Sequence, residues 1–147
     1  MKRARLKPLP RIRAPSPERS AVMRAVKGRG TEPELAVRTI ARRLASGYRL
    51  NRADLPGKPD IVYGPRRLAI FVHGCFWHGH DCARGARMPK ANAAYWQAKI
   101  ARNRARDAAA LKALRRLGWR CLVIYECALK NPSAIERRLA RALVVSR

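Results

Sequence analysis

The sequence is poor in acidic residues. Nine Asp and Glu stand against 34 Lys and Arg among its 147 residues, which gives a formal net charge of +25. Self-repulsion of this size destabilises a compact fold unless a polyanion offsets it, and no small acidic metabolite requires such a field. The charge therefore favours nucleic acid as the partner over an anionic membrane surface.

Long apolar runs are also missing. No segment approaches the roughly 18 apolar residues of a membrane span, and no apolar stretch of a secretory signal follows the basic N-terminus. We therefore expect the protein in a reducing cytoplasm. Cysteines are few, and in that compartment the four that are present are expected to be metal ligands or core thiols rather than disulfides.

The length of the chain fits one hydrophobic core, and 48% apolar residues suffice to fill it. Residues 1–17 are basic and contain four prolines, which interrupt both helices and strand ladders. This segment predicts a flexible arm. Residues 18–147 are predicted to form a single domain, and no internal repeat divides it.

Helices and strands alternate along the predicted domain. A capping box with Thr31 as N-cap and Glu34 at N3 begins one helix, and the apolar run 68–72 is typical of a strand buried on both faces. The predicted helices cover 18–27, 31–46, 92–117 and 133–145, and the predicted strands 59–63, 68–72 and 120–126. Because a helix connects the second and third strands, we expect an α/β fold with a mixed sheet flanked by helices.

The irregular loop predicted at 73–91 is rich in cysteine and histidine. Zinc prefers four thiolate or imidazole ligands, and one distant residue can complete a loop that supplies three. Such a structural zinc site is assigned to Cys75, His80, Cys82 and Cys127, the last of which follows the third strand. Cys121 alternates within an apolar strand and is interpreted as a core residue. A loop with free thiols remains the alternative.

Asp60 follows a proline at the entrance to a predicted strand. Metal-dependent nucleases share this arrangement, and their carboxylates hold Mg²⁺ against the scissile phosphate. Their next strand ends in Glu-x-Lys, whereas here it ends in Val72-His73-Gly74, which indicates either a different nuclease lineage or no nuclease. A simple turn or cap role for Asp60 stays open.

Two polar residues interrupt the apolar face of the predicted helix 92–117. Asn103 and Asp107 continue the line of Trp96 and Ile100 at helical spacing. Buried polar groups need partners, so we expect Asp107 to orient an imidazole at the end of the second strand, at His73 or His78. For Asn103 a plain hydrogen-bonding role is equally open.

At these residues the sequence closely resembles the Vsr family, the very short patch repair endonucleases. The resemblance extends from about residue 17 to residue 143. Its motifs are MRAV (23–26), TEPE (31–34), LPGKPD (55–60), FVHGCFWH (71–78), HDC (80–82), KIARN (99–103), LGW (117–119) and ECAL (126–129). The run HGCFWH with the later HxC and ECAL is too long and unusual to arise by chance.

The resemblance implies a restriction-endonuclease-like fold and a set of catalytic roles. Asp60 and the backbone carbonyl of Val72 would bind Mg²⁺, and a carbonyl ligand tolerates Val where the family often has Thr. His78 would activate the attacking water, and the residues implied to support it are Glu34, His73 and Asp107.

The resemblance also assigns the remaining motif residues. Cys75, His80, Cys82 and Cys127 match the structural zinc site of the family, while Gly79 stands where some relatives carry another histidine. A wedge inserted beside the mismatch is implied for Met23, Phe76 and Trp77. Apolar wedges of this kind pry apart base steps and kink a duplex.

The implied function is a Mg²⁺-dependent endonuclease that nicks one strand 5′ of a T mispaired with G, the product of 5-methylcytosine deamination. Such an enzyme works in the bacterial cytoplasm beside a cytosine-5 DNA methyltransferase and mismatch-repair proteins, and we expect it to be a monomer. Two alternatives stay open: a catalytically silent, zinc-stapled DNA-binding module, and a nuclease of the same fold with another specificity. Asp60, His73, His78 and Asp107 together argue against the silent module.

Overall fold

A four-stranded mixed sheet forms the centre of the structure. The computed structural model describes residues 8–10 and 30–144, and its strands are β1 (Arg49–Leu50), β2 (Ile61–Tyr63), β3 (Leu68–His73) and β4 (Arg120–Tyr125), in that spatial order. β2 is antiparallel to both β1 and β3, whereas β4 is parallel to β3. The predicted α/β fold with a mixed sheet is confirmed.

The predicted hairpin corresponds to β2 and β3. The Arg67 amide donates to the Gly64 carbonyl at 3.0 Å in the turn between them. All residues of both strands are buried, as expected for apolar runs covered on both faces. β2 begins two residues later than predicted: Pro59 has no N–H to place in the strand ladder, and Asp60 bonds to the neighbouring segments through its amide and carbonyl without belonging to the strand.

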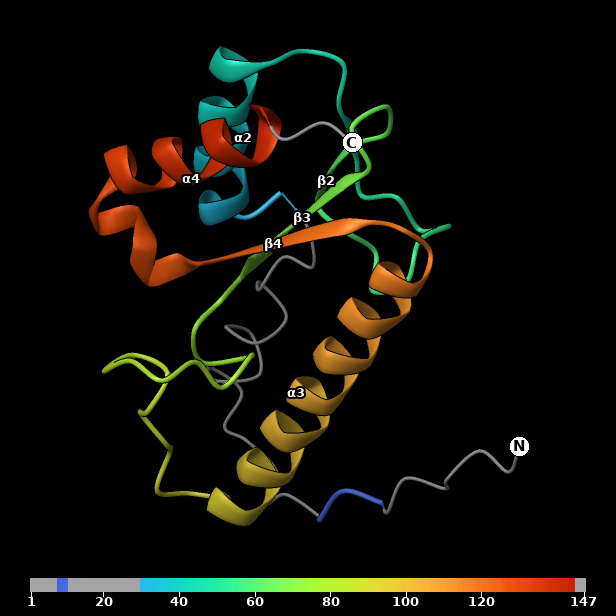
Figure 1. Cartoon of the computed structure of the whole chain (residues 1–147). Coiled ribbons are helices and arrows are strands. Elements are labelled where there is room, and N and C mark those ends of the chain that lie inside the picture. The colour runs from blue at the N-terminus through green and yellow to red at the C-terminus, as the bar shows by residue number, and fades with distance from the viewer. Residues whose placement is uncertain (1–7, 11–29, 145–147) are drawn as a thin grey trace.

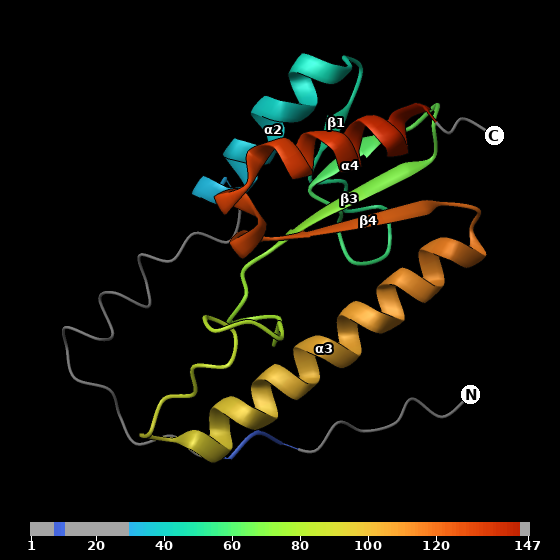
Figure 2. The ribbon, with the colours of Figure 1, turned by 60° about the vertical axis from the view of Figure 1, so that its left-hand side comes forward.

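Three α-helices of the described residues cover the two faces of the sheet. α2 (Glu32–Leu44) and α4 (Pro132–Val144) lie together on one face, and α3 (Ala93–Arg116) crosses the other (Figures 1 and 2). α3 is the crossover that the parallel pair β3 and β4 requires. None of the helices in the described part of the chain is long and apolar enough to span a membrane.

The prediction that the third strand is buried is wrong. Only Ile124 of β4 is buried, and its other five residues are half-buried. Within the described residues β4 pairs with β3 alone, so it lies at an edge of the sheet. Glu126, predicted as the last residue of this strand, begins a 3₁₀ helix, η1 (Glu126–Lys130).

Two short elements have no counterpart in the prediction. β1 consists of two exposed residues whose pairing with β2 fixes their extended shape, and η1 connects β4 to α4. Neither is long enough for hydrophobic periodicity to reveal it. The predicted helix 18–27 and most of the arm at 1–17 lie outside the described residues, so the boundary at residue 18 remains a prediction.

Candidate active site and metal centre

A cavity of about 630 Å³ opens where β3 ends. Segments that are far apart in the sequence meet around it, because α2, the entrance to β2, the end of β3 and α3 all border this edge of the sheet. The predicted catalytic residues that line it are Glu34, Asp60, Val72, His73, His78 and Asp107. The fold therefore brings together every predicted catalytic residue in one place.

Asp60 is fixed at the entrance to β2 by its backbone and its side chain. Its amide donates to the Ile70 carbonyl at 3.0 Å, and its carboxylate accepts from the Val72 amide at 2.7 Å. Burial raises the pKa of Asp60 to about 6, and the nearby Glu34 acts in the same direction, while the Val72 amide opposes them. A cation in this cavity would stabilise the ionised carboxylate.

Glu34 is buried in the first turn of α2, where the helix start positions it. The Thr31 hydroxyl accepts from the Glu34 amide at 3.5 Å, which confirms the predicted N-cap. The Glu34 carboxylate accepts from the Gly30 amide at 2.8 Å. The return bond of the predicted capping box is therefore shifted by one residue from Thr31, and the carboxylate lies in the same cavity as Asp60.

His73 and His78 stack face to face at the other side of the cavity. Their ring centroids are 3.7 Å apart with 1° between the planes, and His78 Nδ1 lies 2.6 Å from Asp107 Oδ2. Since an ionised carboxylate can only accept, the Nδ1 of His78 donates to Asp107, which leaves Nε2 as a proton acceptor. The expected contact between Asp107 and a strand-end imidazole is present, and His78 is the partner.

His73 is buried, with 7% of its surface exposed, and its Nδ1 has no hydrogen-bond partner within residues 8–10 and 30–144. The pKa of His73 is lowered to about 4, first by burial and then by the neighbouring His78, whereas Asp107 acts in the opposite direction. The ring is therefore neutral at physiological pH. His73 is thus a neutral ring that lines the same cavity as Asp60, with a buried Nδ1 that has no partner among the described residues.

The four predicted zinc ligands also come together. The ligand atoms of Cys75, His80, Cys82 and Cys127 all lie within 4.8 Å of one another. Cys127 follows β4 in η1, and its amide lies 3.4 Å from the Cys75 sulfur, so the cluster joins the loop to the end of the sheet. Three thiols and one imidazole can hold a metal ion, and Cys121 is not part of the group, as predicted.

Local backbone geometry presents these thiols. A Cβ on Gly85 would lie 2.0 Å from the His80 carbonyl oxygen, so only glycine allows the loop to fold back this closely. The Gly85 amide donates to the Cys82 sulfur at 3.3 Å and is the main reason that the pKa of this thiol is lowered to about 7. Burial raises the pKa of Cys75 to about 11. A cation bound here would favour both thiolates.

Phe76 and Trp77 lie in the loop of residues 75–82, which carries three of the predicted zinc ligands and is called the metal loop below. Their rings form a cluster with Trp96 of α3. Trp96 of α3 lies 5.8 Å from Phe76 and 5.7 Å from Trp77 between ring centroids, and the ammonium of Lys99 lies 5.3 Å from the Trp77 ring. Helical spacing correctly places Trp96 on the same face of the helix as Asn103, but it did not predict that Trp96 contacts the aromatic residues of the loop. Met23, the third predicted wedge residue, lies outside the described residues.

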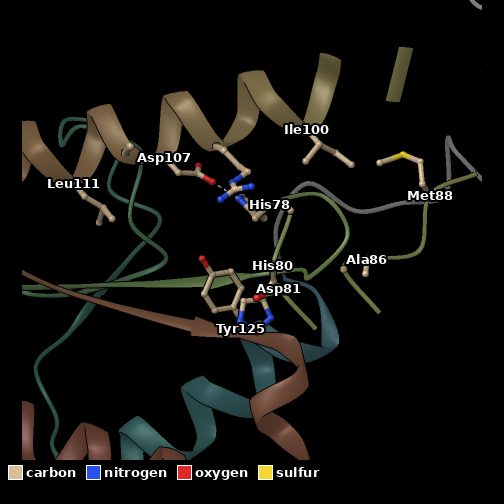
Figure 3. A pocket seen from close by; sticks show the side chains of 13 residues that line it. His78, His80, Asp81, Ala86, Met88, Ile100, Asp107, Leu111 and Tyr125 are labelled. Carbon is tan, nitrogen blue, oxygen red and sulfur yellow. Dashed lines mark hydrogen bonds and ion pairs between the residues drawn. The ribbon is translucent and has the colours of Figure 1, made fainter. Parts of the chain in front are cut away.

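A second cavity, of about 720 Å³, lies between α3 and the metal loop. Asp107 projects from α3 toward His78 on one wall, and Tyr125 and His80 lie together on the other (Figure 3). The rings of His80 and Tyr125 stack with centroids 3.8 Å apart. Packing at the end of β4 thus connects the predicted zinc ligands to the predicted catalytic residues.

Comparison with known proteins identifies relatives of this chain. Residues 14–84 match the family described as DNA mismatch endonuclease Vsr. The chain is 48% identical over 129 residues to the type II nicking enzyme V.XorIIP of Xanthomonas oryzae pv. oryzae, an alignment that covers 87% of this chain and 94% of that protein.

Two further relatives are more distant. The type II nicking enzyme V.NmeAIP of Neisseria meningitidis is 39% identical over 124 residues, covering 84% of this chain and 88% of that protein. The DNA mismatch endonuclease Vsr of Escherichia coli is 39% identical over 113 residues, covering 77% of this chain and 72% of that protein. With this identity over most of its length, the chain belongs to the Vsr family of DNA mismatch endonucleases.

Proposed function

We propose that the protein is a Mg²⁺-dependent endonuclease that nicks one strand of duplex DNA immediately 5′ of a T mispaired with G. The observation that carries the proposal is a single cavity that is lined by two stacked imidazoles, by the acid that orients one of them, and by three further acids, Glu34, Asp60 and Glu126. The printed names of the relatives, mismatch endonuclease and nicking enzyme, support the same reaction class.

His78 is the general base of this proposal. Its Nδ1 is held by Asp107, so Nε2 is free to take a proton from an attacking water. His73, stacked on its ring and neutral, fixes the plane of His78 and keeps a second positive charge away from it. The attack breaks the phosphodiester bond and leaves a 5′-phosphate and a 3′-hydroxyl.

The carboxylate pair fits a magnesium ion. Asp60 and Glu34 line one cavity. Burial and the nearby Glu34 both disfavour the ionised form of Asp60, and a divalent cation would offset this cost. Asp60 and the Val72 carbonyl would hold the ion: the N–H and C=O of an extended residue point to the same side, and the Val72 N–H already reaches Asp60. When bound, Mg²⁺ supplies Lewis-acid stabilisation of charge on the phosphate.

The cysteine and histidine cluster fits zinc. Its donor set of Cys75, His80, Cys82 and Cys127 is one of the common structural combinations, with no position left for a substrate. The ion would hold the loop that carries Phe76, Trp77 and His78, and it would contribute to folding where few apolar contacts exist.

Specificity is assigned to the aromatic residues. Phe76 and Trp77 are half-buried on a loop fixed between Cys75 and His78, and with Met23 they would insert beside the mismatch. A T:G pair stacks poorly compared with Watson–Crick pairs, so the cost of opening it is least. Because this substrate arises from 5-methylcytosine, we propose that the enzyme acts with a cytosine-5 methyltransferase and with mismatch-repair proteins. We further propose that it is a monomer and works in the bacterial cytoplasm.

A nicking assay tests the proposal. Three end-labelled duplexes that differ only in one pair, T:G, C:G or T:A, are incubated with the protein with and without added Mg²⁺; no chelator is used, because it would also remove a structural zinc ion. We expect a single nick 5′ of the mispaired T, only in the T:G duplex and only with Mg²⁺. Equal cutting of all three duplexes would exclude mismatch specificity, and undiminished cutting without Mg²⁺ would exclude the metal requirement.

A further inference from the structure

A third cavity, of about 470 Å³, adjoins the catalytic one on the side of the turn before Asp60. It lies between Gly57 and Lys58 of that turn and the middle of α3, and His73 and His78 line both cavities. The two spaces therefore form one cleft that runs past the stacked histidines. A strand cut at His78 would pass through this adjoining part.

The adjoining cavity is positively charged. Lys58 lines it from the turn and Arg106 lines it from α3, and both side chains belong to exposed residues. Within the described part of the chain neither forms an ion pair, and the one acid on its wall, Asp107, is already bonded to His78. Two cations without a protein counter-ion at a cleft wall are suited to an anion from outside.

The backbone holds Lys58 in an unfavourable conformation. Its φ of 51° lies in the left-handed region, which costs a residue with a side chain roughly 1 kcal/mol or more. The preceding Gly57 is pressed against α3, since a Cβ there would lie 2.7 Å from Ala110 Cβ and 3.1 Å from the Phe71 ring. Strain that the surroundings impose in this way clusters at functional sites.

Two successive hydrogen bonds connect Arg106 to the loop that carries Phe76 and Trp77. Its guanidinium donates to the Asn103 side-chain oxygen, and the Asn103 amide group donates to the Trp77 carbonyl at 2.8 Å. One turn further along α3, Asp107 holds His78. The position of Arg106 is thus tied to the same loop that carries the proposed wedge and the proposed base.

We propose that Lys58 and Arg106 form a phosphate clamp that binds the phosphate next to the scissile one on the strand that is cut. Contacts of this kind fix the register of a nucleic-acid strand without reading its sequence. The clamp would align the scissile phosphate with Asp60 and His78. This inference rests on the proposed nuclease function for its place on the cut strand, but its binding part can be measured separately.

The test measures duplex affinity without added Mg²⁺, so it requires no cleavage and leaves a structural zinc ion in place. Single methylphosphonates, which remove one phosphate charge, are placed in turn at each position around the mismatch in both strands. The variants are Lys58→Asn, which keeps the left-handed preference, and Arg106→Gln, and the matched control is Lys112→Ala, an exposed cation of α3 that does not line the cleft.

We expect wild type and Lys112→Ala to lose about fivefold or more in affinity at one phosphate beside the cut, and Lys58→Asn and Arg106→Gln to lose clearly less there, because each variant has one of the two contacts left. In Mg²⁺ both variants should nick about tenfold more slowly in single turnover, and Lys58→Arg should restore most of the rate. If the methylphosphonate penalties of both variants equal those of wild type, the clamp is wrong. If wild type nicks nothing but the affinity pattern holds, the clamp stands and the proposed function fails.

Discussion

At the scale of single residues, the catalytic cavity places groups where folding alone would not favour them. Asp60 is ionised in a partly buried position beside another acid, and the Nδ1 of His73 is buried without a partner in the described chain. Buried polar groups are normally paired, and exceptions of this kind point to a ligand or to catalysis. The stability that these residues forgo is consistent with a site made for a cation and a phosphate.

This conflict leads to a prediction for Asp60→Asn. The pKa of the folded carboxyl is raised to about 6 from 3.8, so folding disfavours the ionised form, and that penalty is absent at low pH and complete above pH 6. Asn is neutral and its oxygen can still accept from the Val72 amide. At pH 7.5 without added Mg²⁺ we expect the variant to be more stable by roughly 1–3 kcal/mol, seen as a higher midpoint in calorimetry, and to have lost nicking when Mg²⁺ is supplied.

Asp54→Asn is the control for that measurement. Asp54 is exposed and paired with Arg52, so its loss should not raise the stability. Mg²⁺ should raise the midpoint of wild type but not that of Asp60→Asn. An Asp60 variant that cuts at the wild-type rate, or that unfolds at a lower temperature than wild type without added Mg²⁺, would contradict the assignment of Asp60 as metal anchor.

At the scale of elements, the sequence predicts those parts whose signals are local. Thr31 as a cap, the hairpin of β2 and β3 and the long α3 all follow from capping residues and hydrophobic periodicity. β1 and the edge position of β4 do not, because they depend on which strands become neighbours in space. Apolar content alone cannot distinguish an edge strand from a central one.

The same division holds for the candidate site. The cysteine and histidine residues and their spacing were sufficient to predict which four side chains come together as possible zinc ligands. Helical spacing was sufficient to predict that Asp107 contacts an imidazole. The stacking of His73 on His78 and the place of Lys58 beside them depend on loop paths. Those paths are set by close approaches such as that of Gly57 to α3, which no sequence pattern records.

The predicted zinc site supports a prediction that compares Cys127 with Cys121. Purified protein should contain about one zinc ion per chain, and Cys127→Ser should lose the metal and unfold at a lower temperature, because structural zinc contributes folding free energy. Cys121→Ser should keep the metal, since Cys121 packs beside β3 and α3 and not in the cluster. Elemental analysis and thermal unfolding on the same samples measure both. Equal metal loss from the two variants would overturn the ligand assignment.

Phe76 and Trp77 support a prediction that separates recognition of the mismatch from hydrolysis of the strand. Replacing Phe76 and Trp77 together by Ala should bring the ratio of nicking rates on T:G and T:A duplexes close to unity while weak nicking persists. Inserted rings offset an unstacking cost of a few kcal/mol per step, whereas Asp60 and His78 are unchanged.

Zinc content must be determined for this double variant, because both residues lie between Cys75 and His78. Leu35→Ala, which removes an exposed apolar side chain of α2, serves as the control for a change remote from the loop. A double variant that holds its zinc and discriminates as well as wild type would return the two aromatic residues to a structural role.

At the scale of the whole molecule, the positive charge has two uses. Some guanidinium groups cap helix ends: Arg67 donates to the Leu117 carbonyl at the end of α3, and Arg66 and Arg120 donate to the Leu143 and Ala142 carbonyls at the end of α4. Cations at helix C-termini also favour the helix dipole. The remaining cations far outnumber the three arginine–carboxylate ion pairs of the described residues, and they are available to phosphates.

This excess predicts a steep dependence of duplex affinity on salt. Each neutralised phosphate contributes about −0.9 to the slope of log affinity against log salt, and coverage of about six phosphates gives a slope near −5. Residues 1–13 carry six of the Lys and Arg residues, so their deletion should flatten the slope without moving the cut site. Fluorescence anisotropy across a salt series measures both slopes, with Lys112→Ala as a single-charge control. A slope near zero for the full chain would exclude a polyanion partner, and an unchanged slope after deletion would exclude the arm from DNA contact.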